Sequence, residues 1–337
     1  MAKTRNYDGE NVRVRPARSS RPRSKDRPDY SQSEVALVIS VDRGRTTCLI
    51  ESKGLVVMAM KARELGKQSV VVGDQVGLVG DLTGGAGTLA RIVKVHPRRN
   101  ELSRTIDDTE KVEKRIVANV DQMVIVVAAT NPEPRHGFVD RALVIAFDQG
   151  IKPILIVTKT DLDSGEEFLK PYRDLEVEIF TTKSLNEPAK KSLLRGDGLK
   201  EIRKVLNGKM TVLLGHSGVG KSTLVNSLVE AADQVTGSVN DVTGRGRHTS
   251  SAAIAFALNP GWIIDTPGVR SFGVAHVDSA RVISAFSEFE KIVQHCPKNC
   301  SHDEESCALN DSEFNQGLGE KSKSRLASLR RMLSSAR

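Results

Sequence analysis

The chain is 337 residues long, 39% of them hydrophobic, and it carries a formal net charge of +8. This length predicts two or three domains with ample chain for a buried core, and the charge suggests a polyanionic partner. Because no apolar run reaches membrane-spanning length and no secretory signal is present, we expect a cytoplasmic protein without a membrane partner.

Residues 1–32 are expected to form a disordered basic arm. Residues 1–30 carry nine Lys or Arg against four Asp or Glu, and the stretch VRVRPARSSRPRSKDRPD is almost free of apolar side chains. This composition is compatible with RNA affinity and equally with a plain linker.

Residues 33–104 are expected to form a small β-barrel of the OB type. The runs VALVISV, RTTCLIE, LVVMAM, VVVGDQVGLVG and ARIVKV predict five short strands without a helix of any length between them. Such barrels commonly hold nucleic acid. Because aromatic stacking residues are missing here, contact with backbone phosphates is the expected mode.

Residues 105–277 change to an alternation of buried strands and amphipathic helices, which predicts a doubly wound, mostly parallel sheet. MVIVVAA, PILIV, VEIF, TVLL, AIAFAL and WIID are the expected strands. Residues 278–337 are expected to be helical, with a Cys/His cluster and a basic tail. The predicted fold class is therefore multidomain, with a barrel, an α/β domain and a helical domain.

A possible base-reading motif follows PILIV, at Thr158, Lys159, Thr160 and Asp161. Guanine-nucleotide proteins carry N-K-x-D at the end of a strand, where the Asp accepts two hydrogen bonds from guanine and the Lys stem packs along the base. Thr158 stands in place of the usual Asn. We expect this change to remove an amide that normally ties loops together.

The most specific motif is G-x-x-x-x-G-K-[ST], between the strand TVLL and a predicted helix. Glycines let backbone N–H groups curl around polyphosphate, the Lys reaches the β- and γ-phosphates, and the Ser binds Mg²⁺. The expected nucleotide-binding residues here are Gly215, His216, Ser217, Gly218, Val219, Gly220, Lys221, Ser222 and Thr223.

A third nucleotide signal, D-T-P-G, ends the strand WIID. Asp265 is expected to hold Mg²⁺ through water, and the N–H of Gly268 to sense the γ-phosphate. The polar, glycine-rich stretch before it has the composition of a mobile switch, in which Thr249 or a neighbouring hydroxyl would join Ser222 around Mg²⁺.

The order of these motifs is unusual. T-K-x-D precedes the phosphate loop by more than fifty residues, and nothing resembling it follows Gly268. In a Ras-type chain the phosphate loop comes first. The order therefore predicts a circularly permuted G domain.

The C-terminal region carries the pattern C-x3-C-x-H-x4-C. Three thiolates and one imidazole at short spacing suit one structural, tetrahedral zinc ion per chain. His276 and His295 compete for the imidazole position, but Cys-x-His geometry favours His302. The expected ligands are Cys296, Cys300, His302 and Cys307.

With a barrel, permuted nucleotide motifs and a Cys₃His cluster in this order, residues 33–320 resemble the RsgA (YjeQ) family of GTPases. The stretches NVDQMVIVVAATNPEP, GHSGVGKSTLVNSL, GRGRHTSSAA and DTPGVRSFG carry the resemblance. It implies an OB domain, a permuted G domain and a zinc domain that bind the 30S ribosomal subunit, with its 16S rRNA, during late maturation. It also implies GTP hydrolysis stimulated by that subunit, and we expect the protein to act as a monomer.

The catalytic residue comes from the same resemblance. Val269 follows D-T-P-G, where Ras-like enzymes place a water-orienting Gln, and an apolar side chain cannot take that role. The resemblance implies that His248 of the GRGRHT stretch substitutes for it. A solvated switch histidine is the alternative.

We therefore expect an enzyme that hydrolyses GTP to GDP and phosphate with Mg²⁺. The alternative is an rRNA-binding assembly factor whose nucleotide only sets affinity, with hydrolysis incidental. An adenine-nucleotide kinase is disfavoured by T-K-x-D and by the lack of a recognisable phosphoacceptor domain. The basic arm and Lys321–Arg331 are expected to add rRNA affinity.

Overall fold

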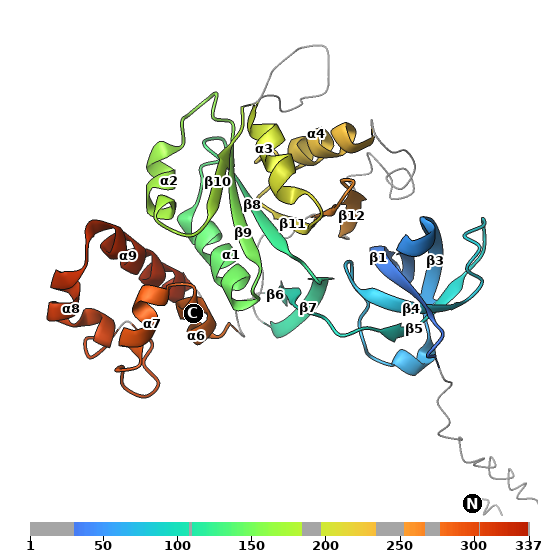
Figure 1. The fold of residues 1–337 in the computed structure, drawn as a ribbon, viewed down its shortest axis with the longest axis horizontal. Coiled ribbons are helices and arrows are strands. Elements are labelled where there is room, and N and C mark those ends of the chain that lie inside the picture. The colour runs from blue at the N-terminus through green and yellow to red at the C-terminus, as the bar shows by residue number, and fades with distance from the viewer. Residues whose placement is uncertain are drawn as a thin grey trace, which may run out of the picture. The chain divides into compact units, whose positions relative to one another are not determined.

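The computed structural model describes residues 30–107, 110–183, 197–233, 253–266, 277–302 and 304–335. The chain divides into two compact units, residues 1–32 and residues 33–337. All the helices and strands of the described residues lie in the second unit (Figure 1).

Five strands close into the predicted N-terminal barrel. The strand order β1-β2-β3-β5-β4 returns to β1 through an additional β1–β4 pairing, with β3 and β5 parallel and the other pairs antiparallel. Alternate residues point inward, as a half-buried strand requires, and form one apolar cluster that includes Val38, Ile50, Leu78 and Ile92. The elements are β1 (Glu34–Asp42), β2 (Arg45–Ile50), β3 (Leu55–Lys61), β4 (Gln75–Gly80) and β5 (Ala90–Val95), with short 3₁₀ turns η1 (Glu51–Lys53) and η2 (Arg63–Leu65).

A hairpin that the sequence did not indicate follows the barrel. Strands β6 (Glu101–Asp107) and β7 (Glu110–Ala118) pair with each other as a separate antiparallel sheet. Just before it, Arg98 forms a bidentate ion pair with the fully buried Asp74 of the barrel, at 2.7 and 2.8 Å. The predicted domain boundary after Arg104 falls within β6, and the division into domains stays a prediction.

The central sheet follows the predicted α/β pattern. Its strand order is β10-β9-β8-β11-β13-β12, parallel except for β12. A single residue pair, Ser40 with Ile254, connects β12 to β1 of the barrel. The strands are β8 (Gln122–Ala128), β9 (Lys152–Thr158), β10 (Glu178–Thr181), β11 (Met210–Leu214), β12 (Ile254–Ala257) and β13 (Trp262–Asp265).

Helices cover both faces of this sheet, as the continuous apolar strands predicted (Figure 1). Along β8, for example, Ile125 and Val127 belong to the cluster on the α1 and α2 face, whereas Val124 and Val126 belong to the opposite one. The helices are α1 (His136–Asp148), α2 (Glu166–Arg173), α3 (Asp197–Leu206) and α4 (Lys221–Asp233), with α3 and α4 sharing a face.

The C-terminal region is helical, as expected, and packs on α1 and α2. Its helix α9 shares the apolar cluster of the α1 face, and Arg331 forms an ion pair with the fully buried Asp140 of α1. The elements are α6 (Ser279–Ser284), α7 (Ser287–Val293), η3 (Ala308–Asn310), α8 (Ser312–Gly317) and α9 (Glu320–Ser335).

The basic segment Lys321–Arg331 uses its arginines internally. Arg325 pairs with Glu288, Arg330 donates to the Leu309 carbonyl at 2.7 Å, and Arg331 pairs with Asp140. Lys321 and Lys323 are exposed, and Lys323 pairs with Glu320 at 3.1 Å. Contact of this segment with rRNA stays a prediction.

Within the described part of the chain, no helix combines the length and the apolar character to cross a bilayer.

Candidate nucleotide site and Cys₃His cluster

The carboxyl ends of three parallel strands bring the nucleotide motifs to one edge of the central sheet. β9 ends at Thr158, β11 ends at Leu214 before the phosphate loop, and β13 ends at Asp265. Neighbouring parallel strands share their carboxyl edge, and β8 lies between β9 and β11. The motifs therefore meet in space despite their order along the chain.

The phosphate loop, residues 215–220, connects β11 to α4 and needs its glycines. A Cβ on Gly215 would lie 2.5 Å from the Val126 carbonyl oxygen of β8, so no side chain fits there. Gly218 and Gly220 have φ of 80° and 92°, in the left-handed region that other residues rarely adopt. The glycine pattern thus follows from close approach and backbone conformation.

Lys221, the first residue of α4, lies across its own loop. Its ammonium donates hydrogen bonds to the carbonyls of Gly215, at 2.5 Å, and His216, at 2.8 Å. Burial lowers the pKa of Lys221, while the nearby Asp265 carboxylate acts to raise it. This geometry holds a partly desolvated positive charge at the point where phosphates would enter.

Thr158 ties the end of β9 to the phosphate loop, contrary to our expectation. Its hydroxyl is buried and lies 2.6 Å from the Val219 carbonyl oxygen and 3.2 Å from that of Val127. The Thr158 hydroxyl thus makes a cross-loop contact of its own, because Thr158 lies directly beside Gly220.

The remaining residues of T-K-x-D are held by two other loops. Lys159, at a φ of 59°, donates to the Asn131 carbonyl in the loop after β8. The N–H of Thr160 donates to the Thr182 carbonyl at 3.2 Å, just beyond β10. Asp161 is exposed at this edge.

Asn131 was not among the predicted site residues. Only the position of its loop, at the end of a buried strand, could have indicated it. The ring of His216 also contacts that of Phe138, with centroids 4.5 Å apart.

A magnesium site would draw on hard oxygen ligands at this edge. Ser222 follows Lys221 in the first turn of α4, and Asp265 is the partner of Leu213 in the β11–β13 ladder. Thr266 reinforces this register, since its hydroxyl donates to the Leu213 carbonyl at 2.8 Å. A hydroxyl and a carboxylate on neighbouring elements fit such an ion. The other predicted switch residues, His248, Thr249 and Gly268, lie outside the described residues.

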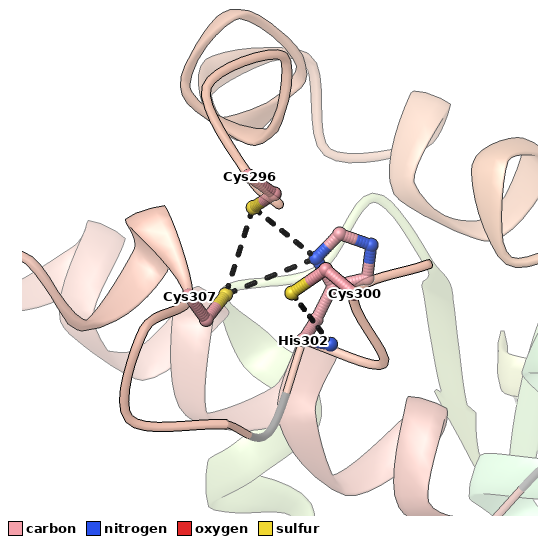
Figure 2. A group of neighbouring side chains, drawn as sticks. All are labelled: Cys296, Cys300, His302 and Cys307. Atoms are coloured by element: carbon pink, nitrogen blue, oxygen red, sulfur yellow. Dashed lines mark hydrogen bonds between the residues drawn. The ribbon is translucent and has the colours of Figure 1, made fainter. Parts of the chain in front are cut away.

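The four predicted metal ligands converge in the C-terminal region (Figure 2). Their ligand atoms all lie within 4.8 Å of one another. Cys296 and Cys307 sulfurs are 3.7 Å apart, and the His302 Nδ1 lies 3.6 and 3.8 Å from them. Tetrahedral zinc with bonds of about 2.3 Å to sulfur separates its sulfur ligands by about 3.8 Å. The four residues could therefore hold a metal ion of this kind.

His302 is the imidazole of this group, as the Cys-x-His spacing favoured. His295 is exposed and outside it, and His276 lies outside the described residues. Burial raises the pKa of the Cys307 thiol, which disfavours the thiolate unless a cation balances it. Glu304, which accepts hydrogen bonds from the Ser301 N–H, fixes the loop around Cys300.

Comparison with known proteins agrees with this arrangement. A family model described as RsgA GTPase matches residues 95–275. The Small ribosomal subunit biogenesis GTPase RsgA of Ectopseudomonas mendocina is 39% identical over 65% of this chain and 63% of its own length. That of Azotobacter vinelandii is 38% identical over 72% of this chain and 68% of its own length. The chain thus spans a little under two thirds of the first relative.

Two solved structures share the fold. YjeQ from Thermotoga maritima matches with a TM-score of 0.60 and 23% identity, over 89% of this chain and 98% of that one. YloQ, described as a circularly permuted GTPase, matches with a TM-score of 0.59 and 22% identity, over 91% and 97%.

A barrel, a parallel sheet whose phosphate loop follows T-K-x-D in the chain, and a helical region with a Cys₃His cluster together define the circularly permuted GTPase fold. The chain belongs to the RsgA GTPase family, on the match of its family model and of its curated relatives.

Proposed function

We propose that this protein hydrolyses GTP to GDP and phosphate in the biogenesis of the small ribosomal subunit. The contact of the Thr158 hydroxyl with the Val219 carbonyl carries the proposal, because it joins the base-reading motif to the phosphate loop. A base and its phosphates can be held together only where these two motifs meet. The family and the names of the curated relatives support the ribosomal setting.

In this proposal, the N–H groups of residues 215–220 cradle the phosphates. Lys221 exchanges its two carbonyl partners for phosphate oxygens, and Asp161 accepts hydrogen bonds from guanine while the Lys159 stem supports the base. Ser222, Asp265 and Thr249 would hold Mg²⁺, and the N–H of Gly268 would sense the γ-phosphate. Bound Mg²⁺ would neutralise charge on the phosphates.

Hydrolysis is proposed to be slow in the free protein and stimulated by the 30S subunit, with release late in maturation. His248 would orient the attacking water when the subunit is bound. Cys296, Cys300, His302 and Cys307 would hold one structural zinc ion, since a closed set of four protein ligands has no open position for catalysis. We further propose that the protein is a cytoplasmic monomer that contacts 16S rRNA.

The proposal is tested by measuring initial and single-turnover rates of GTP and ATP hydrolysis. Each rate is measured with purified 30S subunits, with 50S subunits and without ribosomes. We expect hydrolysis of GTP only, accelerated by 30S subunits alone, and one zinc per chain by metal analysis of the same preparation. A His248→Ala variant should bind GDP normally and lose the stimulation.

Three outcomes contradict parts of this proposal. GTP hydrolysis that ignores the 30S subunit would favour an assembly factor in which hydrolysis is incidental. Equal use of ATP would remove the base-reading role of Asp161. If 30S subunits stimulate GTP hydrolysis by His248→Ala as strongly as by the wild type, His248 has no catalytic role and is a solvated histidine.

A further inference from the structure

The edge of the central sheet opposite the nucleotide motifs carries a hollow of about 370 Å³. One wall is α3, which ends at Leu206 just before β11 begins, and the other is the turn between β12 and β13. Both walls lie at the amino ends of β11 and β13, whereas the phosphate loop and Asp265 lie at their carboxyl ends. A ligand in this hollow leaves the nucleotide site open.

Three cations line the hollow from α3: Lys200, Arg203 and Lys204. Residues three and four positions apart share a face of a helix, so these side chains point the same way. Among the described residues, no acidic side chain lines the hollow and none forms an ion pair with these cations. Within the described part of the chain, the arginines of α9 are paired internally, whereas Lys200, Arg203 and Lys204 have no acidic partner.

The rest of the lining offers amide and apolar groups beside the three cations. Asn207 and Asn259 add amides, and the partly buried Leu258 adds an apolar surface beside the buried Leu206. Phosphates, hydroxyls and the flat faces of sugars or bases are therefore all matched by groups within one hollow.

The walls are joined by backbone contacts. The Gly208 N–H donates to the Pro260 carbonyl at 2.9 Å, and the Trp262 N–H donates to the Lys209 carbonyl at 2.8 Å. A Cβ on Gly261 would lie 2.9 Å from both the N and the O of Lys209, so the two turns are in direct contact. The hollow is thus a preformed feature of the sheet edge.

We propose that this hollow is a docking site for the sugar–phosphate backbone of RNA, with Lys200, Arg203 and Lys204 on the phosphates. The choice of RNA over an acidic protein rests on the proposed function, which supplies a ribosomal partner rich in backbone phosphate. Its position lets the protein hold RNA and nucleotide at once, from opposite edges of one sheet.

The test compares two triple variants that lose the same charge. The first is Lys200→Gln, Arg203→Gln and Lys204→Gln. The control is Lys152→Gln, Lys170→Gln and Arg173→Gln, whose cations are exposed and already paired with Glu178, Glu167 and Glu166. Equilibrium binding to purified 30S subunits and to protein-free 16S rRNA is measured over a series of KCl concentrations, with a non-hydrolysable GTP analogue.

The hollow variant should bind both targets about tenfold more weakly, and the slope of log affinity against log salt should shrink by about one for each lost phosphate contact. GDP binding should be unchanged, and the control variant should match the wild type. Equal weakening of both variants, or an unchanged salt slope, overturns the proposal.

Three further outcomes bear on this proposal and on the proposed function. If the hollow variant no longer binds 30S subunits but still binds protein-free 16S rRNA, the partner is a protein and the RNA assignment is wrong. If the wild type binds 16S rRNA through the hollow but shows no 30S-stimulated hydrolysis, the docking site stands and the proposed function does not. If the wild type binds neither target, both are wrong.

Discussion

At the residue scale, the single hydroxyl of Thr158 links the end of β9 to the phosphate loop. Guanine-binding motifs usually carry an Asn at this position, and its replacement suggested a lost connection between loops. The structure instead buries the hydroxyl 2.6 Å from the Val219 carbonyl oxygen, in the middle of the phosphate loop. A short side chain suffices because β9 ends directly against that loop.

Replacing Thr158 by Val keeps the shape of the side chain and removes this contact. The Val219 carbonyl is then left without its hydroxyl partner, at a cost of roughly 1–2 kcal/mol, and to the extent that this cost falls on the nucleotide-bound loop the Kd for GDP weakens, by up to about tenfold. Titration with a fluorescent GDP analogue measures the change, and Thr158→Ser serves as the control that retains the hydroxyl. Wild-type affinity in the Val variant would show that the contact does not shape the loop.

At the scale of helices and strands, apolar runs predicted the barrel and the central sheet because burial on one or both faces is encoded locally. The β6–β7 hairpin was missed, since its strands, ELSRTID and EKVEKRIVA, are dominated by charged and polar residues. The cluster spacing identified the four candidate ligands, and the fold then placed His302, not the exposed His295, beside the thiols.

The pairing of α7 with α9 through Glu288 and Arg325 should make this region sensitive to acid. Burial acts to raise the pKa of Glu288, but the hydrogen bonds and charge of the Arg325 guanidinium, a backbone hydrogen bond and the charge of Lys321 together outweigh it and leave the pKa below its ordinary value. A carboxyl with a depressed folded pKa stabilises the fold above its unfolded pKa, about 4.3, and loses this contribution as pH falls through the folded value.

Melting temperatures measured from neutral pH down to about pH 3 test this expectation, because this range crosses the pKa of Glu in the unfolded chain. The melting temperature of the wild type should fall below the unfolded pKa. Glu288→Gln should have a lower melting temperature at neutral pH and a weaker dependence of melting temperature on pH. Glu167→Gln, which alters an exposed ion pair on α2, is the control. A Glu288→Gln profile parallel to that of the wild type contradicts the assignment.

At the scale of the whole molecule, the central sheet explains how motifs in a permuted order can form one site. T-K-x-D and the phosphate loop are separated along the chain, yet parallel strands bring them to one edge. The chain after β13 continues into the C-terminal region, whose helix α9 packs back on α1 and α2. Tyr172 of α2 joins this contact, since its hydroxyl donates to Asp140 at 3.2 Å.

Arg331→Met should reveal how strongly this docking supports the fold. It leaves the buried Asp140 carboxylate without its guanidinium, and removing one partner of a buried ion pair costs about 3 kcal/mol. Urea unfolding measures the loss. The double variant Asp140→Asn with Arg331→Met should be less destabilised than the sum of the single changes, and simple additivity would show that the two side chains do not interact.

The sequence alone determined which chemistry the chain carries, because phosphate loops, metal-ligand spacings and buried strands are written in contiguous residues. Only the tertiary structure decided which distant groups meet: Thr158 with Val219, Arg331 with Asp140, and α3 with the β12–β13 turn. Such contacts depend on strand register and helix packing, which arise from the whole core and leave no local pattern. For the same reason only the structure showed that the arginines of α9 have partners within the fold, whereas Lys200, Arg203 and Lys204 of α3 have no acidic partner among the described residues.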